Sequence, residues 1–444
     1  MSPRRRFPSA LAEPEERGVT DARRLRHHSR RRRLRGFGYL GRLGPGLVTG
    51  ASDDDPSGIG TYSQVGAAFG YGLLWTAVVS LPLAAAVQEC AARLGLVKGK
   101  GLVTCIKERF PRWIPVVAVV LVVSANVFNI SADLAAMAAA TRLVLPLPYV
   151  ALLFVIAGTS IGLEVALPYR RYARVLRWLT LSLVSYVVVL AVVRVPWRTV
   201  GVRTVVPRLS FDRVTLAALI ALFGTTISPY LFFWQTSEEV EEEQEREMFQ
   251  PVTSAHLSAM RADVIAGMLS AVAVMFAIMV ASAATLGAHG ITTVGTADQA
   301  ARALRPLAGR LAGLLFALGV VGTGALAVPV LAGSTAYAVS EALGWREGLA
   351  RRFREAHGFY GAIALSVVVG LGLDLAGVDP IRGLYLAAIL NGLAAPPLIA
   401  LMLVMSISRR SLPDHRGGWL STTLLGAALV IMLVLPIAYL LSGR

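Results

Sequence analysis

Charged residues are scarce in this sequence. Only 16% of its 444 residues are charged, 55% are hydrophobic, and the mean hydropathy is +0.62. A water-soluble protein of this length would need a polar exterior, which this composition does not supply. Long apolar runs recur along the whole chain, each near the ~20 residues that a helix needs to cross ~30 Å of hydrocarbon. The composition therefore excludes a soluble protein and predicts an all-α polytopic membrane protein.

Cysteine and histidine are scarce as well. The two cysteines, Cys90 and Cys105, provide neither a disulfide framework nor a zinc site. None of the six histidines falls within an apolar run, and neither a nucleophile–base pair nor a phosphate-binding loop is apparent. We therefore expect no enzymatic activity and no resident cofactor.

The net charge of +16 is concentrated in a few segments. Residues 1–42 form a basic tail, which next to a membrane span favours cytoplasmic retention and attraction to anionic lipid over nucleic-acid binding. With this tail inside, the positive-inside rule is met by basic residues near 93–107, 170–177, 351–354 and 409–416. The arginine-rich loop 194–213 does not follow the rule, because this topology places it outside. We expect a multi-pass protein of the inner (plasma) membrane with a cytoplasmic N-terminus.

Apolar windows predict eleven spans. They lie near residues 45–67, 70–94, 114–141, 147–167, 173–194, 213–237, 261–287, 309–340, 358–376, 381–407 and 417–441. The stretches 98–110 and 297–306 are typical of short amphipathic helices at the surface.

Spans one and six differ from the others, because a proline with small or hydroxyl-bearing neighbours interrupts each of them in mid-membrane. Paired interruptions at corresponding positions indicate a transporter site built on inverted repeats. Broken backbone at this depth is tolerated only where it lines a cavity or is buried in protein. We expect a first repeat over 43–195, a second over 196–407, and an eleventh span within 408–444.

The stretch 238–243, directly after span six, is almost entirely acidic. Such a run could concentrate cations at an inner vestibule. A solvated loop or a frayed helix end is the more common structure of a like-charge run, and we expect that here.

Three consecutive carboxylates, Asp53 to Asp55, lie inside the first apolar span. An unpaired carboxylate in hydrocarbon costs on the order of 3 kcal/mol, so such residues face water or bind a cation. We expect Asp55 to be the charged ligand of a cation. We expect Asp53 or Asp54 to cap the second half-helix. If Asp54 is not the cap, we expect it to lie on the release path of the ion or close to the bound ion.

The neighbours of these acids favour a cation site. Pro56 removes a backbone donor and Gly58 loosens the helix that follows. The unwound turn then exposes backbone carbonyls near Ser52, beside the Asp55 carboxylate. Carbonyl and carboxylate oxygens suit hard divalent cations.

The break in span six repeats this pattern without a charge. Thr225, Thr226 and Ser228 offer hydroxyls, Thr225 also offers a freed carbonyl, and Tyr230 offers a phenol. All of these are oxygen donors. No sulfur is present at this break, which disfavours a site tuned for soft metals.

Asp133 is a further acid within an apolar span, beside Asn126, Asn129 and Ser131. Three roles are open for it: a second cation contact on the release path, a structural acid hydrogen-bonded to its neighbours, and a proton carrier.

Together these segments resemble the natural resistance-associated macrophage protein family of divalent-metal transporters. The resemblance covers residues 45–407 and is carried by Asp55-Pro56-Ser57-Gly58, by Gln64-Val65-Gly66-Ala67-Ala68-Phe69-Gly70-Tyr71, and by Gln88-Glu89 with Ala92-Arg93-Leu94-Gly95. It implies a LeuT-like fold in which eleven spans include two inverted five-span repeats. It also places Asn391, in span ten, near a polar residue of the pore.

The sequence departs from the family's transition-metal motifs at three places. Gly58 replaces the asparagine of Asp-Pro-Gly-Asn, Ser228-Pro229-Tyr230 replaces Met-Pro-His, and Ala136 replaces the glutamate of Asp-Leu-Ala-Glu. This combination resembles the family's branch of NRAMP-related magnesium transporters, in which an enlarged, oxygen-lined site accepts a partly hydrated ion. Because Mg²⁺ dehydrates reluctantly, we expect Gly58 and Ser228 to add the room that it needs.

The expected function is therefore an uncoupled, proton-independent secondary transporter that imports Mg²⁺ and Mn²⁺ by alternating access. Its partners are divalent metal ions and the lipid bilayer, not nucleic acid, and its transport unit is a monomer. One alternative is a proton-coupled Mn²⁺/Fe²⁺ symporter of the same family. Another is an amine or amino-acid carrier on the same fold, which the aspartate-crowded break opposes. A non-transporting membrane receptor is a third.

Overall fold

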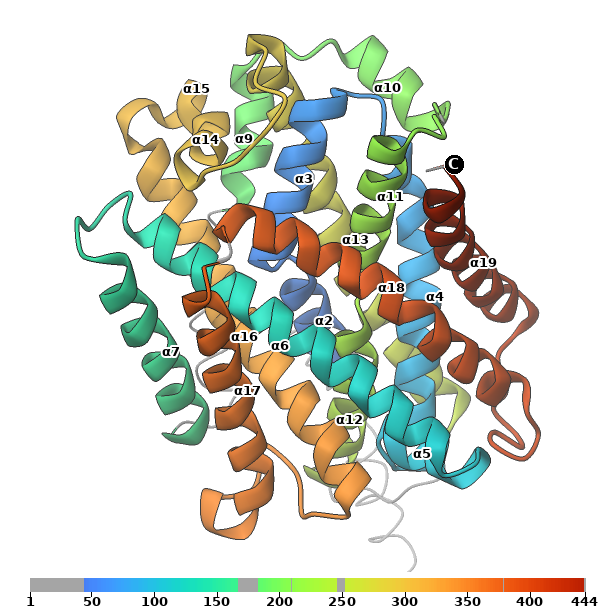
Figure 1. The fold of residues 1–444 in the computed structure, drawn as a ribbon. Coiled ribbons are helices and arrows are strands. Elements are labelled where there is room, and N and C mark those ends of the chain that lie inside the picture. The colour runs from blue at the N-terminus through green and yellow to red at the C-terminus, as the bar shows by residue number, and fades with distance from the viewer. Residues whose placement is uncertain (1–43, 167–182, 209, 246–251, 378, 443–444) are drawn as a thin grey trace, which may run out of the picture. The chain divides into compact units, whose positions relative to one another are not determined.

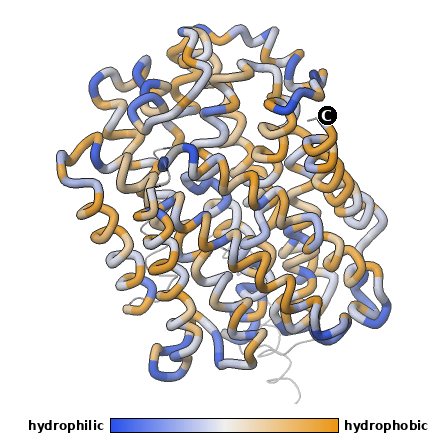
Figure 2. The backbone as a smooth tube through the Cα atoms, in the orientation of Figure 1, coloured by the Kyte–Doolittle hydropathy of each residue, from blue (hydrophilic) through white to orange (hydrophobic). Residues whose placement is uncertain are grey.

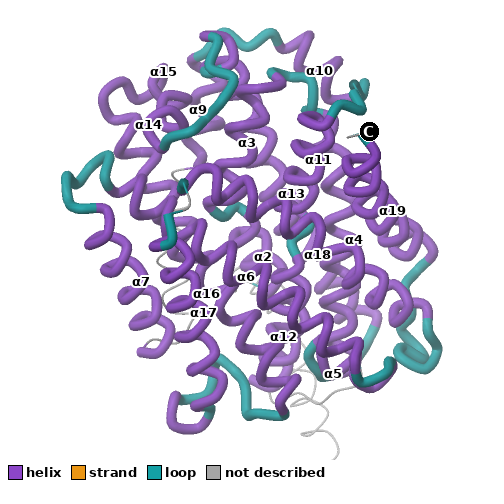
Figure 3. The backbone as a smooth tube through the Cα atoms, viewed as in Figure 1, coloured by secondary structure: helices purple, strands orange, loops and turns teal. Residues whose placement is uncertain are grey.

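A computed structural model of the chain describes residues 44–166, 183–208, 210–245, 252–377 and 379–442. The expected basic tail lies outside these residues. The described part is helical almost throughout and contains no strand (Figure 3). An all-α fold is thus confirmed.

The helices follow one another in close succession (Figure 1). The longer ones are α2 (Pro45–Asp53), α3 (Pro56–Phe69), α4 (Trp75–Lys98), α6 (Trp113–Thr141), α7 (Tyr149–Ala166), α9 (Val184–Val192), α11 (Arg213–Thr226), α12 (Pro229–Glu245), α13 (Ser254–Thr285), α16 (Ala312–Leu343), α17 (His357–Leu375), α18 (Pro380–Ile407) and α19 (Trp419–Leu441). The connections carry α5 (Leu102–Arg109), α10 (Trp197–Val205), α14 (Ala297–Ala301) and α15 (Arg305–Ala308), with single 3-10 turns at Gly287–His289, Arg302–Leu304, Gly309–Leu311 and Phe353–Glu355.

Nine helices of the described residues are long and apolar enough to cross a membrane. Two of the eleven predicted spans are missing from this set, for different reasons. The first is present as two shorter helices, α2 and α3, on either side of Asp54 and Asp55. The fifth, expected at 173–194, falls largely outside the described residues, which retain only α9 of it.

Of the nine membrane-length helices among the described residues, the second broken helix is the most buried and the last helix is the least buried. The most apolar stretch of α11–α12 is 94% buried, whereas that of α19 is only 17% buried. The side chains that α19 exposes are themselves apolar, among them Val430, Leu433 and Val434. Figure 2 shows hydrophobic residues along the lengths of the helices and many hydrophilic ones in the connections. This distribution fits a bundle whose outer helices face lipid.

Glycines let several of these helices approach at backbone distance. A Cβ atom added to Gly50 in α2 would lie 2.3 Å from the carbonyl oxygen of Gly267 in α13. A Cβ atom on Gly224 in α11 would lie 2.1 Å from the carbonyl oxygen of Ala388 in α18. Small residues at helix contacts are the usual means of close packing within membranes. Each broken helix is therefore held tightly by an unbroken partner, α2 by α13 and α11 by α18.

The surface elements agree only partly with expectation. The amphipathic helix expected at 98–110 is α5, and that expected at 297–306 is a series of short turns around α14 and α15. The loop 194–213 contains a helix, α10, that the sequence interpretation missed.

The expectation of a solvated acidic loop after span six was wrong. α12 continues as a helix to Glu245, and Glu238 and Glu239 are buried within it. The carboxylate of Glu241 accepts hydrogen bonds from the Tyr337 hydroxyl and, at 2.7 Å, from the backbone N–H of Leu349. Donors from α16 and from the connection that follows it therefore stabilise a run that would repel itself in water.

Candidate functional site

The break in the first span lies where the sequence places a proline. α2 ends at Asp53 and α3 begins at Pro56, whose missing N–H costs nothing at the first position of a helix. Asp55 is the N-cap of α3, with extended backbone. Its Oδ1 atom accepts hydrogen bonds from the Ser57 hydroxyl at 2.6 Å and from the Gly58 N–H at 2.7 Å. The side chain of Asp55 thus completes the start of the second half-helix.

This cap corrects the sequence interpretation, which assigned capping to Asp53 or Asp54 rather than to Asp55. A proline at the first helical position places the residue before it at the cap, and that residue is Asp55. The prediction of Asp55 as a cation ligand is not contradicted, because the cap occupies one of its two carboxylate oxygens.

The second break has the same design without a charge. α11 ends at Thr226, Ile227 and Ser228 leave the helical conformation, and Pro229 starts α12. The Ser228 hydroxyl lies 2.9 Å from the carbonyl oxygen of Gly224 and 2.8 Å from that of Thr225. The freed Thr225 carbonyl expected as a cation ligand is therefore present, and in this structure it accepts from Ser228.

Two contacts bring the breaks together. The Tyr230 hydroxyl donates a hydrogen bond of 2.9 Å to the Ser52 carbonyl, and the hydroxyls of Ser57 and Thr225 are 3.3 Å apart. Because Ser57 also contacts Asp55, the predicted site residues from both breaks form one buried cluster. The structure thus joins segments that lie about 170 positions apart in the chain.

The space beside Gly58 is already occupied. A Cβ atom on Gly58 would lie 3.1 Å from Cε2 of Tyr62 and 3.4 Å from the carbonyl oxygen of Asp53. Tyr62 is buried and packs where a larger residue at position 58 would extend. The gain of room expected from Gly58 stays a prediction, and in this conformation the aromatic ring of Tyr62, one helical turn later, packs beside that glycine.

Asp53 is the acid that the sequence interpretation undervalued. Both of its carboxylate oxygens are buried without a hydrogen-bond partner among the described residues, as is one oxygen of Asp54. The Tyr230 hydroxyl is near enough to the carboxylates of Asp53 and Asp55 to interact with both electrostatically. A buried carboxylate without a partner is costly unless a proton or a cation neutralises it. This part of the cluster is therefore suited to receive positive charge.

Asp133 belongs to the same region. It lies in α6, which contacts α3, and its carboxylate interacts electrostatically with that of Asp55. It is fully buried, and neither oxygen has a hydrogen-bond partner among the described residues. The neighbouring Asn126 donates instead to α16, at 2.7 Å to the Ser334 hydroxyl. All three roles of Asp133 stay predictions: neither carboxylate oxygen makes a hydrogen bond of ordinary length, but the backbone N–H of Ser57 is near enough to stabilise its charge.

Asn391 lies on α18, which packs against α3, α6 and α11. Its side chain is fully buried, and both amide atoms lack a partner among the described residues. The position of Asn391 is compatible with the pore role that the resemblance implies.

A sulfur atom lies near the second break after all. The Thr226 hydroxyl donates at 2.6 Å to the Leu222 carbonyl and lies 3.9 Å from Sδ of Met275 in α13. The expectation that this break lacks sulfur holds for its own residues but not for its surroundings. A side chain 49 positions away carried no signal in the local sequence.

The donors at this site are mainly oxygens. Among the described residues, no group of three or more histidine, cysteine, aspartate and glutamate side chains is placed to hold a metal ion. A cation bound at the breaks would therefore be held by few carboxylates together with carbonyls, hydroxyls and water, which is the donor set of a hard, partly hydrated ion.

Two acids near the helix ends have structural partners. Glu89 forms ion pairs of 3.0 Å with Arg93 and with Arg261. Asp263 in α13 accepts a hydrogen bond of 2.7 Å from the backbone N–H of Gly46 and so satisfies the start of α2.

Comparison with known proteins agrees with this geometry. Residues 46–442 match the family model described as natural resistance-associated macrophage protein-like. The chain is 27% identical over 406 residues to a divalent metal cation transporter, MntH, of Acidiphilium cryptum, which covers 88% of each chain. It is 32% identical over 295 residues to an MntH of Klebsiella pneumoniae, covering 64% of this chain and 68% of that protein.

Solved structures share the fold at lower identity. A manganese transporter of Eremococcus coleocola, solved with an aromatic bis-isothiourea compound, superposes with a TM-score of 0.68 at 19% identity, over 88% of this chain and 84% of that one. Mhp1, a nucleobase-cation-symport-1 family transporter, superposes with a TM-score of 0.58 at 14% identity, over 90% and 92% of the two chains. The similarity to a second transporter family confirms the LeuT-like architecture.

Proposed function

Because this chain belongs to the natural resistance-associated macrophage protein-like family, we propose that it carries divalent metal ions across a membrane, and that it imports Mg²⁺ and Mn²⁺ without proton coupling. Relatives named as divalent metal cation transporters, and a structural neighbour named as a manganese transporter, support the first part. The chemistry of the two breaks supports the second.

The observation that carries this proposal is the cluster of buried oxygen donors at the breaks. Asp53 has two carboxylate oxygens without a partner among the described residues, and Asp55 and Tyr230 lie beside it. A dication would neutralise two carboxylates at once, whereas a monovalent ammonium would leave one charge buried. The cluster therefore favours a divalent metal over an amine as cargo.

We assign Asp55 as the charged ligand and the carbonyls of Ser52 and Thr225 as neutral ligands. In this structure the Ser52 carbonyl accepts a hydrogen bond from the Tyr230 hydroxyl, and the Thr225 carbonyl accepts one from the Ser228 hydroxyl. The two hydroxyls therefore occupy the positions that an ion and its waters would take. Binding requires the hydroxyls to rotate toward water. A small, strongly hydrated ion meets this arrangement by keeping part of its water shell.

Transport of such an ion needs no proton gradient. An ion of charge +2 gains about 4.6 kcal/mol from a membrane potential of ~100 mV, twice the ~2.3 kcal/mol per elementary charge. The chain lacks a histidine after Pro229 and a second acid at Ala136, where proton-coupled relatives are expected to carry titratable groups. The membrane potential alone then supplies the driving force.

A second candidate is a proton-coupled importer of Mn²⁺ or Fe²⁺. Two observations favour it: the thioether of Met275 near Thr226 suits softer metals, and the unpartnered Asp133 can carry a proton. The variant Met275→Leu separates the candidates, because it keeps the volume and removes the sulfur. A hard-ion site predicts unchanged Mg²⁺ and Mn²⁺ uptake, whereas a selective loss of Mn²⁺ uptake supports the second candidate.

Reconstituted vesicles test the mechanism directly. Vesicles with an imposed inside-negative potential are expected to accumulate Mg²⁺ and Mn²⁺, and an internal pH dye is expected to report no acidification. Vesicles with only a pH gradient are the matched control and should show no accumulation. Acidification that accompanies metal uptake would contradict our proposal and support the proton-coupled candidate.

The organisation of the chain is part of the proposal. We assign the two inverted repeats to 43–195 and 196–407, place the N-terminus in the cytoplasm, and take the monomer in the plasma membrane as the transport unit. Single cysteines introduced at Gly99 and at Gly290, both exposed turns, are expected to react with an impermeant reagent from opposite sides. Labelling of both from one side would refute this orientation.

A further inference from the structure

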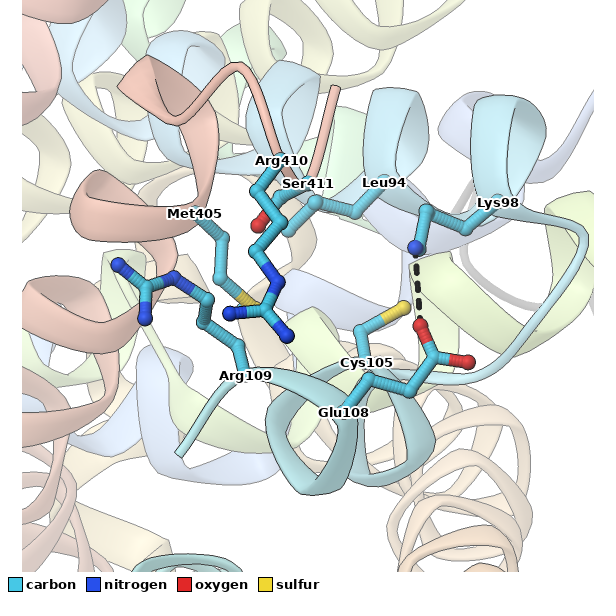
Figure 4. A pocket seen from close by; sticks show the side chains of 8 residues that line it. All are labelled: Leu94, Lys98, Cys105, Glu108, Arg109, Met405, Arg410 and Ser411. Carbon is cyan, nitrogen blue, oxygen red and sulfur yellow. Dashed lines mark ion pairs between the residues drawn. The ribbon is translucent and has the colours of Figure 1, made fainter. Parts of the chain in front are cut away.

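A small pocket lies between the ends of α4 and α5 and the segment that joins α18 to α19 (Figure 4). Its volume is about 80 Å³, and Leu94 and Met405 supply its apolar lining. A single water needs roughly 10–15 Å³ of such volume, so the pocket has room for one small polyatomic ion with a few waters. It is far in sequence from the two helix breaks and shares no residue with them.

The pocket carries excess positive charge. Lys98, Arg109 and Arg410 line it together with one acid, Glu108. Glu108 is already engaged, at 2.9 Å by Lys98 and at 2.5 Å by Lys100. These hydrogen bonds lower the pKa of Glu108, which therefore stays ionised and matched to the lysines. The positive charges of Arg109 and Arg410 are therefore not balanced by an acid that lines the pocket.

The two arginines lack an anionic partner. Within the described ranges, neither Arg109 nor Arg410 forms an ion pair or a side-chain hydrogen bond, and Arg109 only lies over the ring of Phe110 at 5.8 Å. Figure 4 shows the Arg410 side chain extending from its loop toward α5, the helix that carries Arg109. Two guanidinium groups in one pocket repel each other unless an anion lies between them, and arginine forks match the oxygens of phosphate and carboxylate.

The surroundings place the pocket at the boundary between lipid and water. Trp113 opens α6 shortly after α5 and is 66% exposed, and Trp419 opens α19 shortly after the pocket segment and is 80% exposed. Exposed tryptophans at span ends typically lie at the level of lipid headgroups. α5 buries Val103 and Ile106 and exposes its charged residues, as an interfacial helix does.

We propose that this pocket binds one phosphate group, presented by an anionic phospholipid headgroup or by a soluble phosphate compound. The guanidinium groups of Arg109 and Arg410 hold the phosphate oxygens, and the Ser411 hydroxyl lies on the wall of the same pocket. The location at headgroup depth favours the lipid, because basic pockets between spans are a recurrent site for acidic headgroups. Cys105 takes no part, since burial raises the pKa of its thiol to about 12 and keeps it neutral.

The test compares two double variants of the full-length chain with the same change of charge. Arg109→Gln with Arg410→Gln removes the pocket arginines. Arg112→Gln with Arg409→Gln removes two exposed arginines nearby that do not line the pocket. Binding is titrated with the protein in phosphatidylcholine nanodiscs. We expect the pocket variant to bind roughly tenfold more weakly per lost arginine, which corresponds to ~1.4 kcal/mol each, and the control to keep saturable binding close to that of the parent.

Two titrants separate the sources of the phosphate. If phosphatidylglycerol saturates a single site that the pocket variant loses, the ligand is a lipid headgroup. If inorganic phosphate saturates that site and phosphatidylglycerol does not, the ligand is a soluble phosphate compound. Equal weakening in the pocket and control variants, or no saturable binding of either titrant to the parent, would overturn the proposal. Should the double pocket variant fail to fold, the single variant Arg410→Gln against Arg409→Gln decides by the same criterion. The outcome does not depend on which ion the protein carries.

Discussion

At the scale of single residues, the proline of each break determines what its neighbours do. Pro56 makes Asp55 the cap of α3, so one carboxylate serves both the helix and the proposed ion. The two duties respond differently to substitution. Capping needs an oxygen acceptor, which asparagine also provides, whereas binding a cation needs the negative charge.

Asp55→Asn is therefore expected to fold like the parent and to lose metal uptake at least about tenfold, the equivalent of ~1.4 kcal/mol. Asp55→Ala should lose uptake and, in addition, about 1 kcal/mol of stability from the missing cap. Thermal unfolding in detergent and vesicle uptake, measured on both variants, check the two duties separately. Normal uptake by the asparagine variant would remove Asp55 from the ligands.

Glu347 gives a prediction on pH. It lies in the connection between α16 and α17, and burial, with the charges of Glu341 and Glu241, raises its pKa from 4.5 to about 9, against the opposing effect of Arg351 and Lys107. An acid whose pKa is raised on folding contributes stability below its ordinary pKa, and that stability is lost as pH rises toward the folded value.

The variant Glu347→Gln should therefore have a higher unfolding temperature than the parent at neutral pH, and the gain should grow between mildly acidic and mildly alkaline pH. Unfolding curves over this range measure it. Glu355→Gln, at an exposed position for which no such burial exists, is the control and should leave the pH profile unchanged. A pH-independent difference for Glu347→Gln would show that its charge state does not matter.

The residues of the site were only partly predictable. Proline and aspartate act on their immediate neighbours, so the breaks and most donors could be located from the sequence. Tyr62 beside Gly58, and Met275 beside Thr226, depend on which helix faces meet, and no local pattern encodes that. The unpartnered state of Asp53 was equally hidden, since three adjacent acids differ only in the direction that the backbone gives them.

At the scale of elements, the contact between α2 and α13 is made by backbone rather than by side chains. A Cβ atom on Gly267 would lie 2.1 Å from the carbonyl oxygen of Gly46, and one on Gly50 would lie 2.3 Å from that of Gly267. Neither backbone can yield as a flexible side chain would. A methyl group at either position must therefore push the helices apart.

Gly267→Ala is expected to destabilise the protein by about 1–3 kcal/mol, the usual cost of overpacking, and to reduce uptake because α2 carries half of the site. Gly158→Ala in α7 is the matched control, since an added Cβ there meets nothing within 4 Å. Unfolding temperatures of the two variants decide the matter. Equal stability would mean that the close approach of α2 and α13 is not needed.

At the scale of the whole molecule, an ionic network centred on the buried Glu89 and Arg93 joins helices from both expected repeats and the last span. Glu89 and Arg93 of α4 pair with each other, Glu89 also pairs with Arg261 of α13, and Ser421 of α19 donates to Glu89 at 2.7 Å. Arg93 is completely buried. Ser421 thereby ties α19 to this network, in addition to the apolar packing of the buried Leu425, Ala428 and Met432.

Glu89→Gln should therefore cost about 3 kcal/mol, because it leaves the buried Arg93 without its counter-charge. Asp298→Asn, which breaks exposed ion pairs with Arg302 and Arg305, should cost less than about 1 kcal/mol. Protease accessibility of the α18–α19 connection, measured with unfolding temperature, reports whether α19 has loosened. A similar loss in both variants would contradict the role of the network.

The arrangement of spans was largely predictable because hydrophobic length alone marks a membrane helix. The exceptions are informative. α10 is a short helix in a basic connection, and the acidic end of α12 is helical because Tyr337 and the 349–350 amides bind Glu241. Both are tertiary effects that charge counting in a single segment does not detect.

The cap that Asp263 places on α2 also has a consequence for biosynthesis. α2 has only nine residues, and the N–H of Gly46 near its start is satisfied by a carboxylate 217 positions further along the chain. The ribosome therefore releases the first half-helix long before its stabilising partner exists. This half-helix can gain that hydrogen bond only after α13 has been synthesised, so nascent chains that stop before Asp263 should lack the cap on α2.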